Sequence, residues 1–308
     1  AISENPYTPP DVAHATPYGE CTFLNEHTAA LEGRTGDKAI DFLERHAGRP
    51  FFLYLHTMEC HAGKRPVELM EAAAPDASGS KRTTAEEDYD ESIQFADSNF
   101  ERVLDALDAL GLTESTLVVF TSDHGEEFGE GGRGGHGYAP YLEQIHVPLI
   151  LRWPGHIARG QRIAAMTQMT DLTPTLLRAG NASPPEHCQG RALLDWVTGA
   201  AESRPEQCVF GNRGNAAGPV TLLCENWKYT RTGTGATRLT DWTADPLEHQ
   251  DVSAAHPDVA ARMAGALQAH VEEQRAFYRR IYLPSTKAGA VELDATKTEA
   301  MRALGYLD

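Results

Sequence analysis

The first two-thirds of the chain alternates short apolar runs with stretches in which apolar residues recur every three or four positions. The short runs are typical of buried strands, and the recurrent pattern is typical of amphipathic helices. We predict strands at 50–56, 115–120 and 146–153, and helices at 37–45, from about 84 to 110, and at 173–179. Strands that alternate with helices in this way predict an α/β domain with a mostly parallel sheet flanked by helices.

The pattern changes after about residue 200. Short apolar runs at 208–210, 220–223 and 227–230 are separated by Gly, Asn and Thr, which indicates an antiparallel meander. A last helix carries the residues Val259 to His270, with apolar positions on one face. We therefore divide the chain into an α/β part, residues 1–200, and a smaller carboxy-terminal subdomain of antiparallel strands plus a helix, residues 201–308.

The formal net charge of the 308 residues is −17. This excess of negative charge repels nucleic acid and anionic membranes over most of the surface, so neither is an expected partner. No apolar run approaches the roughly 18 residues of a membrane span. An anionic substrate requires a local site that reverses the field, and a bound cation has this effect.

The five cysteines are widely spaced and include no Cys-x-x-Cys pair. This spacing indicates neither a zinc ribbon nor a thioredoxin-like redox site. An odd number of cysteines scattered over so long a chain is not a disulfide scaffold either, and it leaves the cellular compartment open.

The densest set of chemically capable side chains lies in TSDHGEEFGEGGRGGHG, residues 121–137, directly after the strand at 115–120. In open α/β sheets, ligands bind beyond the carboxyl ends of strands, which is where Asp123 and His124 fall. One carboxylate and one imidazole suit a divalent metal. Gly125 permits a sharp turn, and the later glycines would let His136 fold back beside the pair.

A purely structural interpretation of this segment is also open. Asp-His-Gly is a common turn tripeptide, and acidic residues on a glycine-rich loop are usually solvated. We interpret Glu126, Glu127 and Glu130 in this way, as a solvated surface.

Several segments in fixed order carry a resemblance to a known family: PFFLYLHTMECHAG, YDESIQFADSNFERVLDALDALGL, TLVVFTSDHGEEFGE, GGHGYAPYLEQIHVPLILRWPGHIARG and MTDLTPTLLRAG. Together they resemble the sulfatase family of the alkaline phosphatase superfamily, from about residue 37 to the end of the chain. The resemblance implies an alkaline phosphatase-like α/β fold and a metal-dependent sulfuric ester hydrolase.

The resemblance also implies roles for four residues. Asp123 and His124 match a pair of metal ligands, for which calcium is favoured over magnesium or manganese. His61 matches a histidine that contacts the ester group, although Cys60 stands where the family often has proline. His136 matches a sulfate-contacting Lys or His. A metal and imidazoles suit these roles because charge develops on the ester oxygens and the leaving group needs a proton.

Each of the two catalytic assignments has a structural alternative. His61 could be a histidine that only forms a hydrogen bond at the end of a strand. His136 could be a loop residue that faces solvent.

The nucleophile implied by the resemblance is a formylglycine, made from Cys or Ser in a C/S-x-P-x-R segment and preceded by an Asp-Asp pair. Neither pattern occurs in the 308 residues. We therefore expect the chain to be the carboxy-terminal part of a longer sulfatase, nearly inert by itself. We also expect it to associate with a second copy or with a missing amino-terminal fragment.

Two alternatives to a sulfatase stay open. One is a phosphoryl-handling relative, such as a phosphonate or phosphodiester hydrolase or a phosphoethanolamine transferase. The other is a noncatalytic binding or scaffold fragment. For the sulfatase, the expected substrate is a small-molecule or glycan sulfate ester, and the periplasm or secretion is favoured over the cytoplasm.

Overall fold

The computed structural model describes residues 2–3, 34–61, 85–130, 134–137, 139–186, 188–199, 208–212 and 218–281. The chain forms two compact units, Ala1–Thr116 and Leu117–Asp308. The predicted boundary near residue 200 lies within the second unit and stays a prediction.

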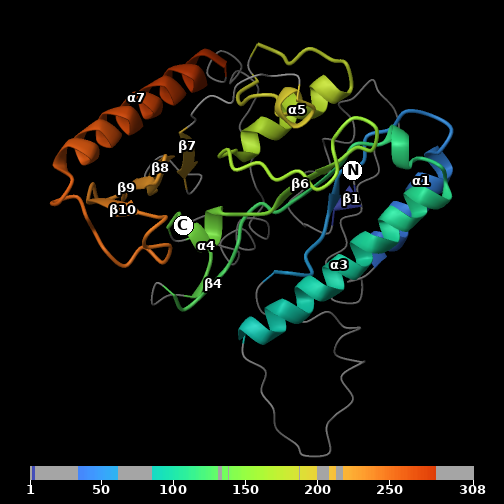
Figure 1. Cartoon of the computed structure of the whole chain (residues 1–308), viewed down its shortest axis with the longest axis horizontal. Helices are drawn as coiled ribbons and strands as arrows, with labels where there is room; N and C mark the ends of the chain where they lie inside the picture. The colour runs from blue at the N-terminus through green and yellow to red at the C-terminus, as the bar shows by residue number, and fades with distance from the viewer. Residues whose placement is uncertain are drawn as a thin grey trace, which may run out of the picture. The chain divides into compact units, whose positions relative to one another are not determined.

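The first unit is built around two helices, α1 (Arg34–His46) and α3 (Ala85–Ala109), which pack side by side (Figure 1). Each helix buries two apolar residues spaced four positions apart, so that one face of each is apolar: these are Ala39 and Leu43 of α1, and Val103 and Leu107 of α3. Both predicted helices are confirmed.

The strands of the first unit are short. β1 (Ile2–Ser3) pairs in parallel with β2 (Leu55–His56), so only the end of the predicted strand at 50–56 forms a ladder. A 3₁₀ turn, η3 (Thr113–Ser115), follows α3 at the end of the unit.

The second unit begins with β3 (Val118–Thr121), which pairs antiparallel with β6 (Leu149–Arg152). Thr121 lies opposite Leu149, so the chain leaves β3 and enters β6 at the same end of the pair. Parallel strands need a crossover connection, whereas antiparallel strands do not. The segment between β3 and β6 therefore returns to the same end of the pair. Among the described strands, only β1 and β2 pair in parallel. The predicted predominance of parallel pairs is therefore not confirmed.

The segment between β3 and β6 holds two very short strands, β4 (Glu127–Phe128) and β5 (Gly134–Gly135), paired antiparallel. It also holds the short helix α4 (Leu142–Ile145). After β6 come η4 (Met169–Asp171), α5 (Leu172–Ala179), which confirms the predicted helix at 173–179, and α6 (Leu194–Val197).

The carboxy-terminal sheet has the order β10-β9-β8-β7, with every neighbouring pair antiparallel. Its strands are β7 (Val209–Asn212), β8 (Val220–Cys224), β9 (Trp227–Arg231) and β10 (Thr237–Asp241). The predicted meander is confirmed. The sequence analysis missed β10, because Leu239 is the one apolar residue in TRLTD and gives too weak an alternation to detect.

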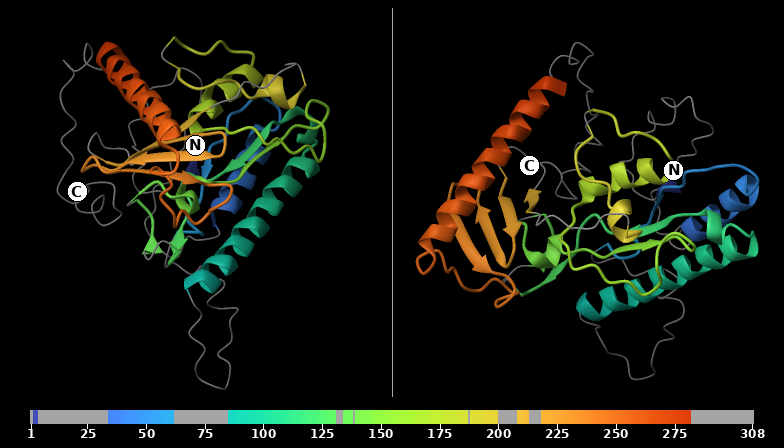
Figure 2. Two further views of the ribbon diagram at one scale, coloured as in Figure 1. Left: turned by 60° about the vertical axis from the view of Figure 1, so that its left-hand side comes forward. Right: turned by 45° about the horizontal axis from the view of Figure 1, so that its top comes forward.

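Helix α7 (Pro257–Ile281) packs against β8 and β9 of this sheet (Figure 2). Buried Met263 and Leu267 of the helix pack with Leu222 and Leu239 of the sheet in one core. At the edge of the ladder, Cys208 and Cys224 form a disulfide across β7 and β8, with their Cα atoms 4.4 Å apart. The cysteine spacing had given no sign of this bond.

Among the described residues, no helix combines the length and apolar character that a bilayer crossing requires.

The core of the carboxy-terminal sheet predicts a large cost for truncating its side chains. Leu222 is fully buried, so Leu222→Ala should lower the free energy of unfolding by about 2–5 kcal/mol through lost burial and a residual cavity. Leu247→Ala is the matched control, because Leu247 is 42% exposed and its truncation should change the stability little. Urea unfolding of both variants measures the difference. Equal losses in the two would contradict this core.

Candidate functional site

The candidate site begins where β3 ends. Ser122 Oγ donates a hydrogen bond to the backbone carbonyl of His124 over 2.6 Å, and the backbone N–H of His124 donates to Asp123 Oδ1 over 3.1 Å. These two local bonds form a tight turn just beyond the strand. The turn holds Asp123 and His124 at the carboxyl end of β3, as the sequence pattern predicts.

The protonation of His124 follows from its neighbours. Its Nδ1 lies 2.8 Å from the carbonyl oxygen of Gly125. A carbonyl can only accept, so Nδ1 carries the proton, and in the neutral ring Nε2 keeps its lone pair. That Nε2 atom lies 3.9 Å from Asp123 Oδ1, and the Asp123 side chain is 58% exposed. His124 Nε2 and Asp123 Oδ1, which could both ligate a metal ion, therefore lie near each other and are accessible to solvent.

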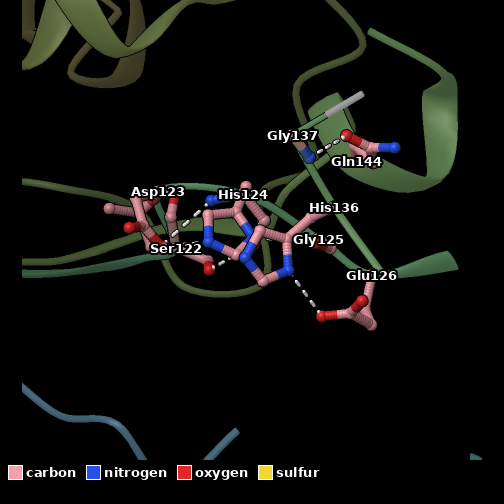
Figure 3. Close-up of polar contacts among 9 residues, drawn as sticks. Ser122, Asp123, His124, Gly125, Glu126, His136, Gly137 and Gln144 are labelled. Carbon is pink, nitrogen blue, oxygen red and sulfur yellow. Dashed lines mark hydrogen bonds and ion pairs between the residues drawn. The ribbon is translucent and has the colours of Figure 1, made fainter. Parts of the chain in front are cut away.

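The β4–β5 hairpin returns the chain to His124. The ring of His136 stacks on the ring of His124, with centroids 4.0 Å apart and planes 28° apart (Figure 3). His136 Nδ1 lies 2.9 Å from Glu126 Oε2. The Glu126 side chain is only 4% exposed, and its other oxygen has no hydrogen-bond partner among the described residues.

The interpretation of the loop carboxylates as solvated surface is wrong for two of the three. Glu126 and Glu127 are buried, because the hairpin directs them toward His136 and toward Gln144. Gln144 Nε2 donates to Glu127 Oε1 over 2.5 Å. Glu130 is half-buried, and its Oε2 accepts from the N–H of Phe128 over 2.7 Å. Buried carboxylates need such donors because an unpaired charge is costly to desolvate.

Gln144 of α4 is the residue that sequence analysis missed. Its backbone carbonyl accepts from the N–H of Gly125 over 2.8 Å, and its Oε1 accepts from the N–H of Gly137 over 2.9 Å (Figure 3). These two glycines are the chain neighbours of His124 and His136. A single residue thus holds both arms of the loop, one through its backbone and the other through its side chain, and nothing in its sequence context, YLEQIH, marks it.

Gly125 is required by the close approach of α4. A Cβ atom at this position would lie 2.0 Å from the backbone oxygen of Glu143. No side chain fits there without a backbone shift. The packing of α4 therefore explains why Asp-His is followed by a glycine.

The donors present fit part of a divalent cation site. Asp123 and His124 supply one oxygen and one nitrogen, whereas calcium takes six to eight oxygen ligands. Within the described residues, no group of three or more His, Cys, Asp or Glu could hold a metal ion. The fixed tautomer of His124 suits metal ligation, because a hydrogen bond at the second ring nitrogen orients a ligating histidine in this way.

His61 belongs to the first unit, in the turn that follows β2. Its backbone N–H donates to the carbonyl of Met58 over 3.0 Å. Next to it, burial and the charge of Glu59 raise the pKa of the Cys60 thiol to about 11. Cys60 is therefore a neutral thiol at physiological pH and a poor nucleophile. The place of His61 beside the other three residues stays a prediction.

The sequence of this chain is similar to sulfatases. The sequence profile of the family described as Sulfatase matches residues 2–182. Mouse steryl-sulfatase is 34% identical over 195 residues, which cover 58% of this chain and 30% of that protein. The N-acetylgalactosamine-6-O-sulfatase of Bacteroides thetaiotaomicron is 26% identical over 266 residues, which cover 75% of this chain and 49% of that protein.

A solved structure supports the fold class. The structure of BT1596, a 2-O GAG sulfatase, aligns with a TM-score of 0.66 at 18% identity and covers 86% of this chain and 68% of that one. The α/β class predicted from sequence is thus the class of its structural neighbours. The chain spans 30% to 49% of the length of the two sulfatases above.

The contact between Gly125 and α4 predicts that even the smallest side chain disturbs the loop. Gly125→Ala should lower the free energy of unfolding by about 1–3 kcal/mol, because the added methyl overlaps the Glu143 carbonyl. Gly265→Ala is the control, since nothing lies within 4 Å of a Cβ atom added at this position in α7. Alanine there should be neutral or stabilising. Thermal unfolding compares the two, and equal stability of both variants would contradict the packing.

Proposed function

The chain belongs to the sulfatase family, and from that premise we propose that it forms part of a sulfuric ester hydrolase. The observation that carries the proposal is the stacked pair of His124 and His136, with Asp123 on one side and buried Glu126 on the other. The relatives are named for steryl and N-acetylgalactosamine sulfates. A small-molecule or glycan sulfate ester is accordingly the proposed substrate.

In this proposal Asp123 Oδ1 and His124 Nε2 hold a divalent cation, with calcium favoured and magnesium or manganese as alternatives. When bound, the cation would neutralise negative charge on the sulfate oxygens. The Gly125 carbonyl holds the proton of His124 on Nδ1, so the lone pair of Nε2 would be the one that binds a cation.

His136 is the proposed contact to the sulfate or to its leaving oxygen. Glu126 accepts from Nδ1 and orients the ring, and Nε2 is the atom proposed to contact the substrate. A carboxylate also stabilises the imidazolium form, in which Nε2 donates a proton. His61 is proposed as the second histidine at the ester.

The nucleophile is proposed to lie outside these 308 residues, since they contain no C/S-x-P-x-R segment. The expected group is a formylglycine, supplied by an amino-terminal polypeptide that carries this segment, and the chain alone should be nearly inert. The Cys208–Cys224 disulfide favours the periplasm or secretion, because such bonds persist in oxidising compartments.

A phosphonate or phosphodiester hydrolase is the second candidate, because a cation and two imidazoles also stabilise a phosphate ester. Relative rates on p-nitrophenyl sulfate and p-nitrophenyl phosphate separate the two, since the leaving group is the same. With a polypeptide that carries the C/S-x-P-x-R segment present, we expect the sulfate to react at least about tenfold faster, a preference of about 1.4 kcal/mol.

Two results would contradict this scheme. Faster turnover of the phosphate would favour the phosphoryl-handling enzyme. Turnover of either ester by the purified 308-residue chain would place the nucleophile within it.

The roles of Glu126 and His136 predict a graded loss of activity in the complemented enzyme. His136→Ala should lower kcat by about 10²–10⁴-fold, the usual contribution of a proton-transferring side chain. Glu126→Gln should lower kcat less, because the amide still accepts from Nδ1 but no longer stabilises the imidazolium. Glu130→Gln is the matched control, since the Glu130 side chain accepts from the backbone N–H of Phe128, a bond that the amide oxygen of Gln can also accept. Equal kcat for the Glu126 and Glu130 variants would refute an orienting role for Glu126.

A further inference from the structure

An ion pair lies buried in the carboxy-terminal sheet. Lys228 lies in β9 and Glu248 in the turn after β10, and Lys228 Nζ donates a hydrogen bond to Glu248 Oε1. The side chain of Lys228 is 1% exposed and that of Glu248 is 3% exposed. Burial lowers the pKa of Lys228, and the charge of Glu248 opposes this shift. A buried ion pair gains little net stability unless further hydrogen bonds compensate its desolvation. Its other contacts therefore indicate its role.

The decisive contact runs from the sheet to α4. Glu248 Oε1 also accepts from the backbone N–H of Leu142, the first residue of α4, over 2.9 Å. The preceding residue, Tyr141, makes no side-chain capping bond, so Glu248 supplies an acceptor that the helix lacks locally. The Tyr141 ring also lies 5.5 Å from Lys228 Nζ. Both members of the ion pair thus contact the start of α4.

Glu248 is itself held in place. Arg238 of β10 donates to its backbone carbonyl. The backbone of Glu248 has a φ of 54°, a left-handed conformation that costs a non-glycine residue free energy. Surrounding contacts must compensate this cost, and they fix the carboxylate beneath α4.

Two later residues of α4, Glu143 and Gln144, contact the loop of the candidate site. Gln144 accepts from Gly125 and Gly137, and the Glu143 carbonyl packs against Gly125. A continuous set of contacts therefore runs from β9 through Glu248 and α4 to both arms of the histidine loop.

We propose that Lys228 and Glu248 are positioning residues, which hold α4 and through it the stacked His124–His136 pair. The carboxy-terminal sheet then sets the geometry of the site through α4. The catalytic meaning of this device rests on the proposed function, but the device itself does not. If Lys228 and Glu248 only filled space in the core, apolar residues would serve as well. The bond from Leu142 to Glu248 would then not be needed.

The first test removes the hydrogen bond to Leu142 and leaves the ion pair in place. Leu142→Pro deletes the N–H that Glu248 accepts, and proline is well accepted at the first position of a helix. The extended backbone of Tyr141, with φ −70° and ψ 158°, already suits a residue that precedes proline. Residue-resolved amide exchange should then show Gly125 and Gly137 exchanging about tenfold faster, as expected for local opening.

The second test removes the ion pair without leaving a buried charge. Lys228→Met combined with Glu248→Leu replaces both groups by apolar ones, a change that buried pairs often tolerate. Gly125 and Gly137 should again exchange faster, and the ¹⁵N signals of the His124 and His136 rings should shift as the Gly125 carbonyl and Glu126 lose their fixed places.

Two references separate positioning from general loosening. The N–H of Trp242, which donates to the Asn226 carbonyl over 3.1 Å, reports the sheet itself and should keep its exchange rate. Glu225→Gln combined with Arg262→Gln removes an exposed ion pair of the same subdomain, 3.4 Å long, and should leave Gly125 and Gly137 unchanged.

The proposal is overturned if Gly125 and Gly137 keep their exchange rates in either folded variant. It is also overturned if Trp242 accelerates as much as they do, because the ion pair would then be part of the core only. Neither readout depends on ester hydrolysis, so an inactive chain tests the proposal equally well. Failure of the proposed function and failure of this inference are thereby distinguished.

Discussion

The candidate site depends on the close packing of the glycine-rich loop against α4. Gln144 binds the backbone beside His124 and beside His136, and the Glu143 carbonyl occupies the space that a side chain at residue 125 would need. Two loop arms that are separated in sequence are thereby brought close enough for their imidazoles to stack. Without this contact, the histidines would lie on a flexible glycine loop, where no fixed geometry is expected.

Buried carboxylates recur through this region, and each has a partner of a different kind. Glu126 pairs with His136, Glu127 accepts from Gln144, and Glu248 pairs with Lys228. In a chain of net charge −17, removing acidic groups from water is costly unless each finds a donor. The donors come from the loop, from α4 and from the sheet, so satisfying these charges joins three segments into one arrangement.

This arrangement gives the carboxy-terminal subdomain a part in the proposed chemistry. Glu248, in the turn after β10, accepts from the first residue of the helix that holds the loop. The family profile matches residues 2–182, and the sheet follows the last matched residue in the chain.

The sequence by itself determined the α/β class, the helices α1, α3, α5 and α7, the meander and the position of Asp123 and His124 past a strand. These features follow from local periodicity and turn chemistry, which depend on residues that are close together in the sequence. The tertiary structure alone decided the antiparallel pairing of β3 with β6, the burial of Glu126 and Glu127, the Cys208–Cys224 bond and the role of Gln144. Each of these depends on which distant segment packs against which, and the hydrophobic pattern of one segment carries no information about its partner.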